Sequence, residues 1–327
     1  MKRYFAFVLM LMVCGCAFPQ SKLKTLYGRV DSLLSKRYNR ITYDTLYVGR
    51  PNTKLTFKLR YNVSGNTFRY KNVGKGYNTH ARLSTDTKGT ISIGASYQGI
   101  GLSYSINPAK LSGRNKDYEF NVSISSKRYL LDLNYLRANT TSGNITSNDE
   151  TYYLDKELMT LKMLSISGYY VFNHRRFSYP AAFTQSYFQK RSAGSWLAGF
   201  SFLGGTIATN EDAPDDFPDM YARMRCASLG GGYGYNLVWR KLLFHLSLMP
   251  SIVFFNYNRI SLEDETKKEY THFPDLQVGL RGAIIYNINP RYFIGSTLIV
   301  NSSTFGNFKH YSSHTRWYAR AFFGFRL

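Results

Sequence analysis

The pair of side chains best suited to chemistry is a histidine and a serine that stand two residues apart. His245 and Ser247 flank Leu246, and residues two apart on a β-strand point to the same side. A serine hydroxyl beside a histidine is the minimal nucleophile and base of a hydrolase. The same spacing occurs at His310 and Ser312, so the spacing alone is weak evidence for catalysis.

A second candidate site is a set of basic side chains that alternate with apolar residues along extended segments. Guanidinium groups hold phosphate or carboxylate by paired hydrogen bonds, so several of them on one face favour anion binding. The alternation predicts that the following residues share an interior face: Lys58, Arg60, Arg223, Arg225, Arg281, Arg316 and Arg320. The alternative is a structural network in which they pair with interior acids such as Glu119 and Asp132.

Carboxylates gather in the segment 209–220, which contains Glu211, Asp212, Asp215, Asp216 and Asp219. Several oxygen ligands are what Ca²⁺ requires. The segment lacks the fixed spacing of a calcium loop, so we expect a solvated acidic loop and keep a metal site as the weaker alternative. No cofactor is predicted.

The first residues have the features of a secretion signal. Lys2 and Arg3 precede an apolar run over 5–13, which small residues follow, as in a cleaved leader. We expect a signal peptide over 1–17, with cleavage before Phe18. The alternative is a lipoprotein signal in which Cys16 is acylated. Of the cysteines, Cys226 alone is certain to survive maturation, and one thiol forms no internal disulfide.

The chain is strongly basic, with a formal charge of +22 that falls to +20 when Lys2 and Arg3 leave with the signal peptide. Such a charge suits partners rich in phosphate or carboxylate. Because an exported protein meets lipopolysaccharide, phospholipid and anionic solutes, we expect these partners and no nucleic acid.

Short alternating stretches predict a membrane β-barrel. No apolar run after the leader reaches the 18 residues of a spanning helix, yet the chain holds 28 Tyr and 23 Phe. Over 54–64, apolar residues alternate with Thr, Lys, Arg, Asn and Ser. This is the period of a β-strand with one face toward lipid and the other toward water. A soluble sandwich is the alternative.

The pattern predicts an all-β, transmembrane, antiparallel up-and-down barrel of about 12 strands, within a range of 10 to 14. An even number suits a closed single-chain barrel. The strands are expected near 54–64, 86–97, 99–107, 117–126, 128–138, 158–172, 195–208, 221–237, 240–257, 273–288, 291–304 and 312–327. The long connections 65–80, 139–157, 209–220 and 258–272 are predicted to be outer loops.

Two segments do not fit the barrel pattern. Residues 22–38 have apolar side chains at helical spacing, so we expect a short periplasmic helix and a linker over 18–53, before a barrel over 54–327. Residues 173–194 fall where a short turn is required. They are predicted to fold inward as a plug, since Pro180 would interrupt a strand ladder; the alternative is an extra hairpin and fourteen strands.

The last strand ends in alternating aromatic and apolar residues, including Phe323, Phe325 and Leu327. Such an end resembles the signal by which the barrel assembly machinery recognises outer-membrane proteins, so that machinery is an expected partner. Tyr118, Tyr135, Trp196, Tyr286, Tyr292 and Trp317 are predicted to form interfacial girdles.

The chain also resembles the domain of unknown function 4421 (DUF4421) family of Gram-negative outer-membrane proteins. The matching stretches are 43–48 (YDTLYV), 54–60 (KLTFKLR), 92–94 (SIG), 99–105 (GIGLSYS), 107–110 (NPAK), 116–120 (KDYEF), 179–183 (YPAAF) and 189–195 (QKRSAGS). The resemblance implies an outer-membrane barrel and brings no activity with it.

We therefore expect a non-enzymatic outer-membrane barrel, either a narrow or plugged pore with a cationic lumen or a structural envelope protein. The alternative is a lipid or lipopolysaccharide hydrolase, because the His-x-Ser spacing of His245 and Ser247 resembles that of outer-membrane phospholipases and deacylases. Against it, Leu246 and its alternating neighbours take the lipid face, so the pair points into the lumen, away from acyl chains.

Overall fold

The structure is a computed structural model of the whole chain. It describes residues 41–53, 55–74, 77–97, 100–106, 118–147, 150–211, 213–214, 219–262, 265–270, 275–306 and 310–327, and the single positions 28, 32, 35 and 108. The chain divides into two compact units, 1–42 and 43–327, and the second is described here. The predicted signal peptide lies outside the described residues, as does most of the predicted helix over 22–38. None of the described helices is long and apolar enough to cross a membrane.

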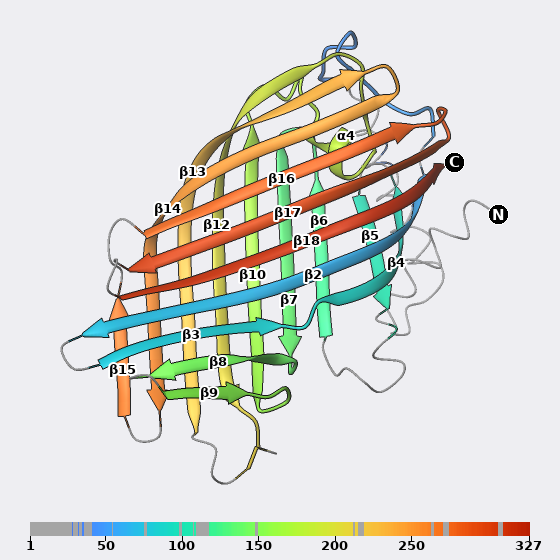
Figure 1. The fold of residues 1–327 in the computed structure, drawn as a ribbon. Coiled ribbons are helices and arrows are strands. Elements are labelled where there is room, and N and C mark those ends of the chain that lie inside the picture. The colour runs from blue at the N-terminus through green and yellow to red at the C-terminus, as the bar shows by residue number, and fades with distance from the viewer. Residues whose placement is uncertain are drawn as a thin grey trace. The chain divides into compact units, whose positions relative to one another are not determined.

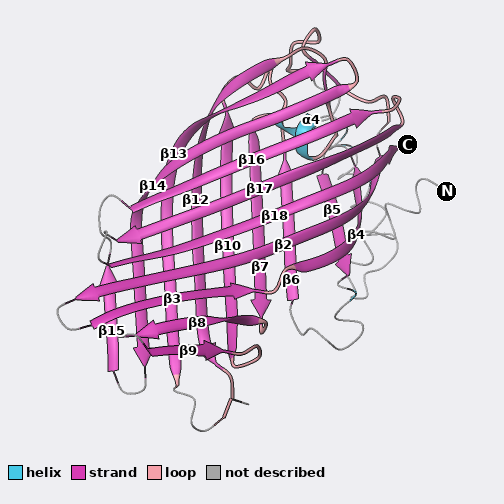
Figure 2. Ribbon diagram, in the orientation of Figure 1, coloured by secondary structure: helices cyan, strands magenta, loops and turns pink. Residues whose placement is uncertain are grey.

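Twelve antiparallel strands form a closed ring, as predicted (Figures 1 and 2). Each pairs with the next, and β18 pairs with β2 from His310 opposite Asn72 to Arg326 opposite Thr56, which closes the barrel. The strands are β2 (Leu55–Gly74), β4 (Lys88–Tyr97), β5 (Ile100–Ile106), β6 (Tyr118–Ser125), β7 (Tyr129–Ala138), β10 (Met159–Val171), β12 (Ala193–Thr209), β13 (Met220–Trp239), β14 (Leu242–Leu262), β16 (Asp275–Asn287), β17 (Tyr292–Gly306) and β18 (His310–Arg326).

Three of the four long connections predicted as loops are wrong in part, because they contain strands. β2 continues to Gly74, and β3 (Tyr77–Thr85), β8 (Thr141–Ser147) and β9 (Glu150–Leu154) extend the sheet beside it. β15 (Glu265–Tyr270) pairs with the end of β14. A strand of 9–11 residues spans a bilayer, so strands of about 20 residues project well past one. These extensions lie at the distal end, opposite the terminal end where β2 begins and β18 ends (Figure 1).

Side chains alternate between the interior and the outer surface. In β14, His245 and Ser247 are buried inside, whereas Leu246 is 62% and Leu248 is 51% exposed outside. The phase changes farther along β14, at a bulge where Ala227 and Ser228 of β13 face Phe255 and Val253, so both Phe254 and Phe255 point outward.

Along the described interior, β10 passes through a terminal apolar layer, a polar layer and a distal apolar layer. Tyr169 and Val171 belong to a terminal apolar layer, Ser165 and Ser167 to a polar layer, and Leu161 and Met163 to a distal apolar layer. The distal layer contains Leu136, Ala138, Leu161, Met163, Leu203, Cys226, Val253 and Phe305. The polar interior expected from the sequence is thus interrupted by apolar clusters at the terminal end and at the distal end.

Candidate functional site in the barrel interior

Residues 173–192, called the plug from here on, fold into the terminal end of the barrel between β10 and β12. The plug contains the helix α4 (Tyr179–Phe183) and the short strand β11 (Phe188–Gln189), and Figure 1 shows α4 within the ring of strands. The predicted inward fold is confirmed, and the alternative of an extra barrel hairpin is wrong because β11 pairs with β1 (Val48–Gly49) instead of a barrel strand.

Local sequence explains why this short helix begins and ends where it does. The Ser178 side chain accepts a hydrogen bond from the Ala181 N–H at 3.2 Å, and Pro180 occupies the first turn, where its missing N–H costs nothing. The helix ends at Phe183 with Thr184 as its C-cap, and Gln185 follows with a positive φ of 53°. The aromatic and alanine side chains of α4 are thereby held against the barrel wall.

Two cations of the barrel wall hold the turn after α4. Lys58 Nζ donates to the Thr184 carbonyl at 2.7 Å and to Gln185 Oε1. Arg326, which is 1% exposed, donates to the Gln185 carbonyl at 3.4 Å, to Pro290 O at 3.2 Å and to Asn287 Oδ1 at 3.3 Å. The last residues of the chain therefore help to fix the plug.

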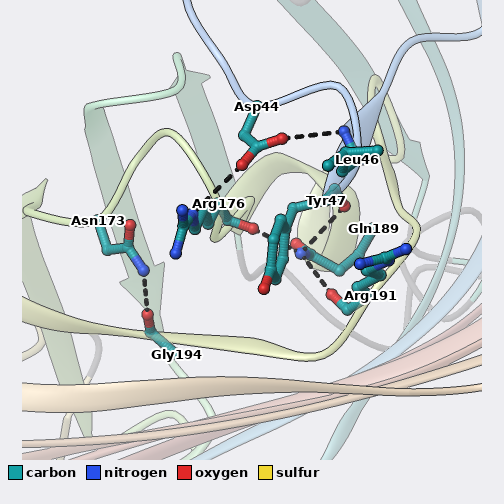
Figure 3. A network of polar contacts seen from close by, with 8 residues as sticks. All are labelled: Asp44, Leu46, Tyr47, Asn173, Arg176, Gln189, Arg191 and Gly194. Carbon is teal, nitrogen blue, oxygen red and sulfur yellow. Dashed lines mark hydrogen bonds and ion pairs between the residues drawn. The ribbon is translucent and has the colours of Figure 1, made fainter.

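Gln189 is the most heavily bonded side chain of the plug (Figure 3). Its Nε2 donates to the carbonyls of Arg176 at 2.6 Å, Arg191 at 2.8 Å and Tyr47 at 3.3 Å. Its Oε1 accepts from the Ser178 N–H at 2.9 Å and from Asn236 Nδ2 at 3.0 Å. One amide thus joins both ends of the plug, the segment before β2 and a barrel strand.

The segment before β2 forms part of the same interior structure. Asp44 accepts from Arg176 at 3.3 Å and from the Leu46 N–H at 3.0 Å (Figure 3), and Val48 is buried against Ala181 and Ala182. Residues 43–53, assigned to a linker from the sequence, therefore belong with the barrel unit.

His245 and Ser247 lie in a chain of three hydrogen-bonded side chains. His245 Nε2 is 3.0 Å from Ser247 Oγ, and His245 Nδ1 is 2.7 Å from Asn236 Oδ1. Asn236 was not predicted from the sequence. The tight turn between β13 and β14 could have identified it, because that register sets Asn236 opposite His245.

Plug residues cover this triad, which consists of Ser247, His245 and Asn236. The rings of Phe177, Tyr179 and Phe183 lie 5.0–5.9 Å from the His245 ring, and the Tyr179 hydroxyl is 3.4 Å from Ser247 Oγ. Burial raises the pKa of Tyr179 to about 12, so its hydroxyl stays protonated.

The sequence also contains a second pair with the His-x-Ser spacing. Its His310 side chain lies outside the described residues.

Five of the seven basic residues predicted to face inward lie on the inward register of their strands. Lys58 and Arg281 are buried, Arg60 follows the phase of Lys58, and Arg316 and Arg320 line an interior cavity. Arg281 donates to Asp132 Oδ2 at 2.8 Å.

The prediction for Arg223 and Arg225 is wrong. They alternate with Cys226, which is buried inside, and Arg225 is exposed on the outer surface. They lie in the distal part of a 20-residue strand, beyond the length that a bilayer covers, where an outward guanidinium meets water at little cost.

The acidic segment 209–220 is described only in part. Glu211 and Asp219 are exposed, and Asp212, Asp215 and Asp216 lie outside the described residues. Within the part of the chain that the structure describes, no group of three or more metal-ligating side chains gathers.

Comparisons with known proteins bear on the fold. A family model described as domain of unknown function (DUF4421) matches residues 42–327, and no curated protein matches the chain. Among solved structures, the outer membrane protease OmpT from Escherichia coli is similar, with 7% identity and a TM-score of 0.47 over 89% of this chain and 100% of that one. The translocator domain of the autotransporter NalP from Neisseria meningitidis is 10% identical, with a TM-score of 0.30 over 94% and 97%. Since both TM-scores are below 0.5, the barrel assignment rests on this chain's own strand pairing.

Replacing Gln189 by Ala should loosen the plug, because it removes the side-chain amide that bonds the Ser178 N–H and the Arg176 and Arg191 carbonyls and leaves these backbone groups without that partner. Each such group costs about 1–3 kcal/mol, so we expect cleavage within the plug by a broad-specificity protease to accelerate at least tenfold. The matched control is Lys190→Ala, which removes one exposed bond to the Thr45 carbonyl. Equal cleavage rates in both variants would show that Gln189 does not hold the plug.

Proposed function

Because the chain belongs to the DUF4421 family, whose description assigns no activity, we propose its function from the geometry of the barrel. We propose that it is a sealed, non-conducting barrel of the Gram-negative outer membrane and serves as a structural component of the envelope. The observation that carries this proposal is that the interior is filled at two levels, by the plug and by the distal apolar layer.

The outer surface supports a place in a membrane. Along β13, Leu229, Tyr233, Tyr235, Leu237 and Trp239 are exposed to the outside within an 11-residue stretch, which matches the length of a spanning strand. Aromatic residues are exposed near the terminal ends of other strands, as in an interfacial girdle: Tyr129, Phe172, Trp196, Tyr286 and Tyr292. Pairing of β18 with β2 joins the two ends of the sheet, which reduces the unpaired edge that hydrocarbon penalises, and among the described residues the least paired seam of the ring is that of β5 with β6, at Ile100 and Ile124. Outer-membrane lipids and lipopolysaccharide are accordingly the proposed surroundings.

The two apolar layers argue against an open pore. A conducting barrel needs a continuous wet path, as in the water-filled lumen of porins. Here Phe177 and Ala182 of the plug are 0% exposed, and so are Val253 and Ala138 of the distal layer. Ions would have to cross two close-packed hydrocarbon layers to traverse the barrel.

Conductance of the purified full chain in planar bilayers tests this function. We expect no stepwise current at moderate voltage, while the same preparation shows heat-modifiable migration on a gel, which controls for folding. A steady, anion-selective current from the folded protein would contradict the sealed barrel and support the pore.

A second candidate function is hydrolysis of an acyl ester, and the triad is the observation that favours it. The order of Ser247, His245 and Asn236 is that of a nucleophile, a base and the group that orients the base. Tyr179 places a protonated hydroxyl beside Ser247, in a position to donate to a developing oxyanion. Because α4 covers the triad, activity would require that the plug move.

A fluorophosphonate probe, which reacts with activated serines, separates the two functions. If the chain is a hydrolase, Ser247 becomes labelled in the wild type or in a Tyr179→Ala variant that thins the cover, and Ser247→Ala abolishes the label. Ser251→Ala is the matched control, since Ser251 is also buried on β14. Absence of label from both the wild type and Tyr179→Ala would exclude the hydrolase and leave the structural role.

A further inference from the structure

An open groove of about 640 Å³ lies on the outer surface of the barrel, across the seam where β18 pairs with β2. Its volume is within the range of small-molecule sites, which is about 300–1,000 Å³. The strands that form it, β16, β17, β18 and β2, face the viewer in Figure 1. This groove, called the seam groove from here on, is lined by exposed apolar side chains: Leu59, Tyr61, Ile284, Tyr286, Ile294 and Phe323.

Small side chains in the middle of one row produce the hollow. Ser296 of β17 stands opposite Ala321 of β18, and both are exposed on the outer surface. The row continues to Tyr61 of β2 on one side and to Ile284 of β16 on the other. Two large side chains therefore flank two small ones. A chain of methylene groups suits this hollow, because it restores the dispersion contacts that the small side chains leave unfilled.

Basic side chains stand at the terminal end of the same strands. Arg291 is exposed in the turn between β16 and β17, and Asn289 Oδ1 orders this turn by accepting from the N–H groups of Arg291 and Tyr292, both at 2.8 Å. Lys241, in the turn between β13 and β14, donates to the Ile288 carbonyl at 3.0 Å, which brings its ammonium group to the same place. An exposed tyrosine at a strand end marks the headgroup level, so these cations lie at the level of lipid phosphates.

The strands and turns around this end of the groove carry no acidic side chain. Residues 54–61, 239–247, 284–296 and 318–327 contain neither Asp nor Glu. A second copy of the chain seated in the groove would bring the same cations to the same level and repel them, whereas a lipid phosphate attracts them. Short turns are typical of the periplasmic side of a barrel, where the adjoining leaflet of a Gram-negative outer membrane consists of phospholipid.

We infer that the seam groove binds an anionic phospholipid. An acyl chain lies over Ser296 and Ala321, and the headgroup phosphate accepts charge-assisted hydrogen bonds from Arg291 and Lys241. The bound lipid covers the pairing of β18 with β2, the contact that closes the ring. This inference rests on the proposed place in the outer membrane and does not require a sealed interior.

Native mass spectrometry of the full chain in detergent measures the lipid preference. The wild type should bind phosphatidylglycerol at least about fivefold more tightly than phosphatidylcholine with the same acyl chains, because one basic side chain near an anionic lipid contributes about that factor. Arg291→Gln should lower the preference about fivefold. Arg175→Gln is the matched control, since it removes an exposed charge from the plug, at the same end of the barrel, and should bind as the wild type does.

Filling the groove tests the position of the acyl chain. Ala321→Phe puts a ring on the floor of the seam groove and should abolish the preference for phosphatidylglycerol. Ala198→Phe puts the same ring on the outer surface of β12, where Ala198 alternates with buried residues between the exposed Trp196 and Phe200. It should leave the preference unchanged.

Equal affinities of the wild type for the two phospholipids would overturn the inference, as would equal preferences within either matched pair of variants. Tighter binding of lipopolysaccharide than of phosphatidylglycerol would also overturn it. So would a lipid-free dimer that Ala321→Phe dissociates, because the groove would then hold a second copy. Failure of the wild type to insert into phospholipid vesicles would contradict the proposed function, whereas equal lipid affinities of a chain that does insert contradict this inference alone.

Discussion

The pairing of β18 with β2 is the contact on which the rest of the structure depends. In hydrocarbon no water is present to bond a free N–H or carbonyl, so a sheet is stable there only when it has no edge. Seventeen residue pairs join the first and last barrel strands, and this ladder extends to the end of the chain. Closure also fixes an inside, and with it the alternation that sends each side chain to one surface or the other.

A closed ring of twelve strands encloses more space than its wall side chains fill at the terminal end, and the chain fills the remainder with its own residues. The plug supplies aromatic and alanine side chains, while Gln189, Lys58 and Arg326 bond the backbone that comes with them. These bonds are necessary because a buried loop brings carbonyl and N–H groups that no sheet ladder satisfies. The triad lies behind this cover, which separates it from solvent at the terminal end.

Much of the architecture could be predicted from the sequence because alternation and turn spacing are local signals. The strand number and the inward fold around Pro180 required no knowledge of distant contacts. The projecting strands β3, β8, β9 and β15 escaped prediction, since short polar stretches such as TSGNITS and ETKKEY are typical of loops and form strands only when a neighbouring strand offers a ladder. The phase of Arg223 and Arg225 was also missed. The prediction assumed that apolar side chains face lipid. Here Met224 and Cys226 pack in an apolar interior layer, so the arginines that alternate with them face outward.

The candidate site was harder to predict than the fold. The His245–Ser247 pair was visible in the sequence, and its inward direction followed from the alternation. Its cover could not be foreseen, because the contacts of Tyr179 and Phe177 with His245 join residues more than sixty positions apart. The polar layer was expected, yet the apolar layers that isolate it depend on how seven or more strands meet inside the ring.

Accessibility along β13 in lipid vesicles tests the sealed, membrane-spanning barrel most directly. Spin labels are placed singly at positions 229–239 in a Cys226→Ser background, and their collisions with lipid-soluble oxygen and with a water-soluble nickel complex are compared. The account predicts that odd positions collide with oxygen and that even positions collide with neither reagent. Strong nickel collisions at the even positions would reveal a water-filled lumen, and strong nickel collisions at the odd positions would place the outer surface in water; either result would contradict it.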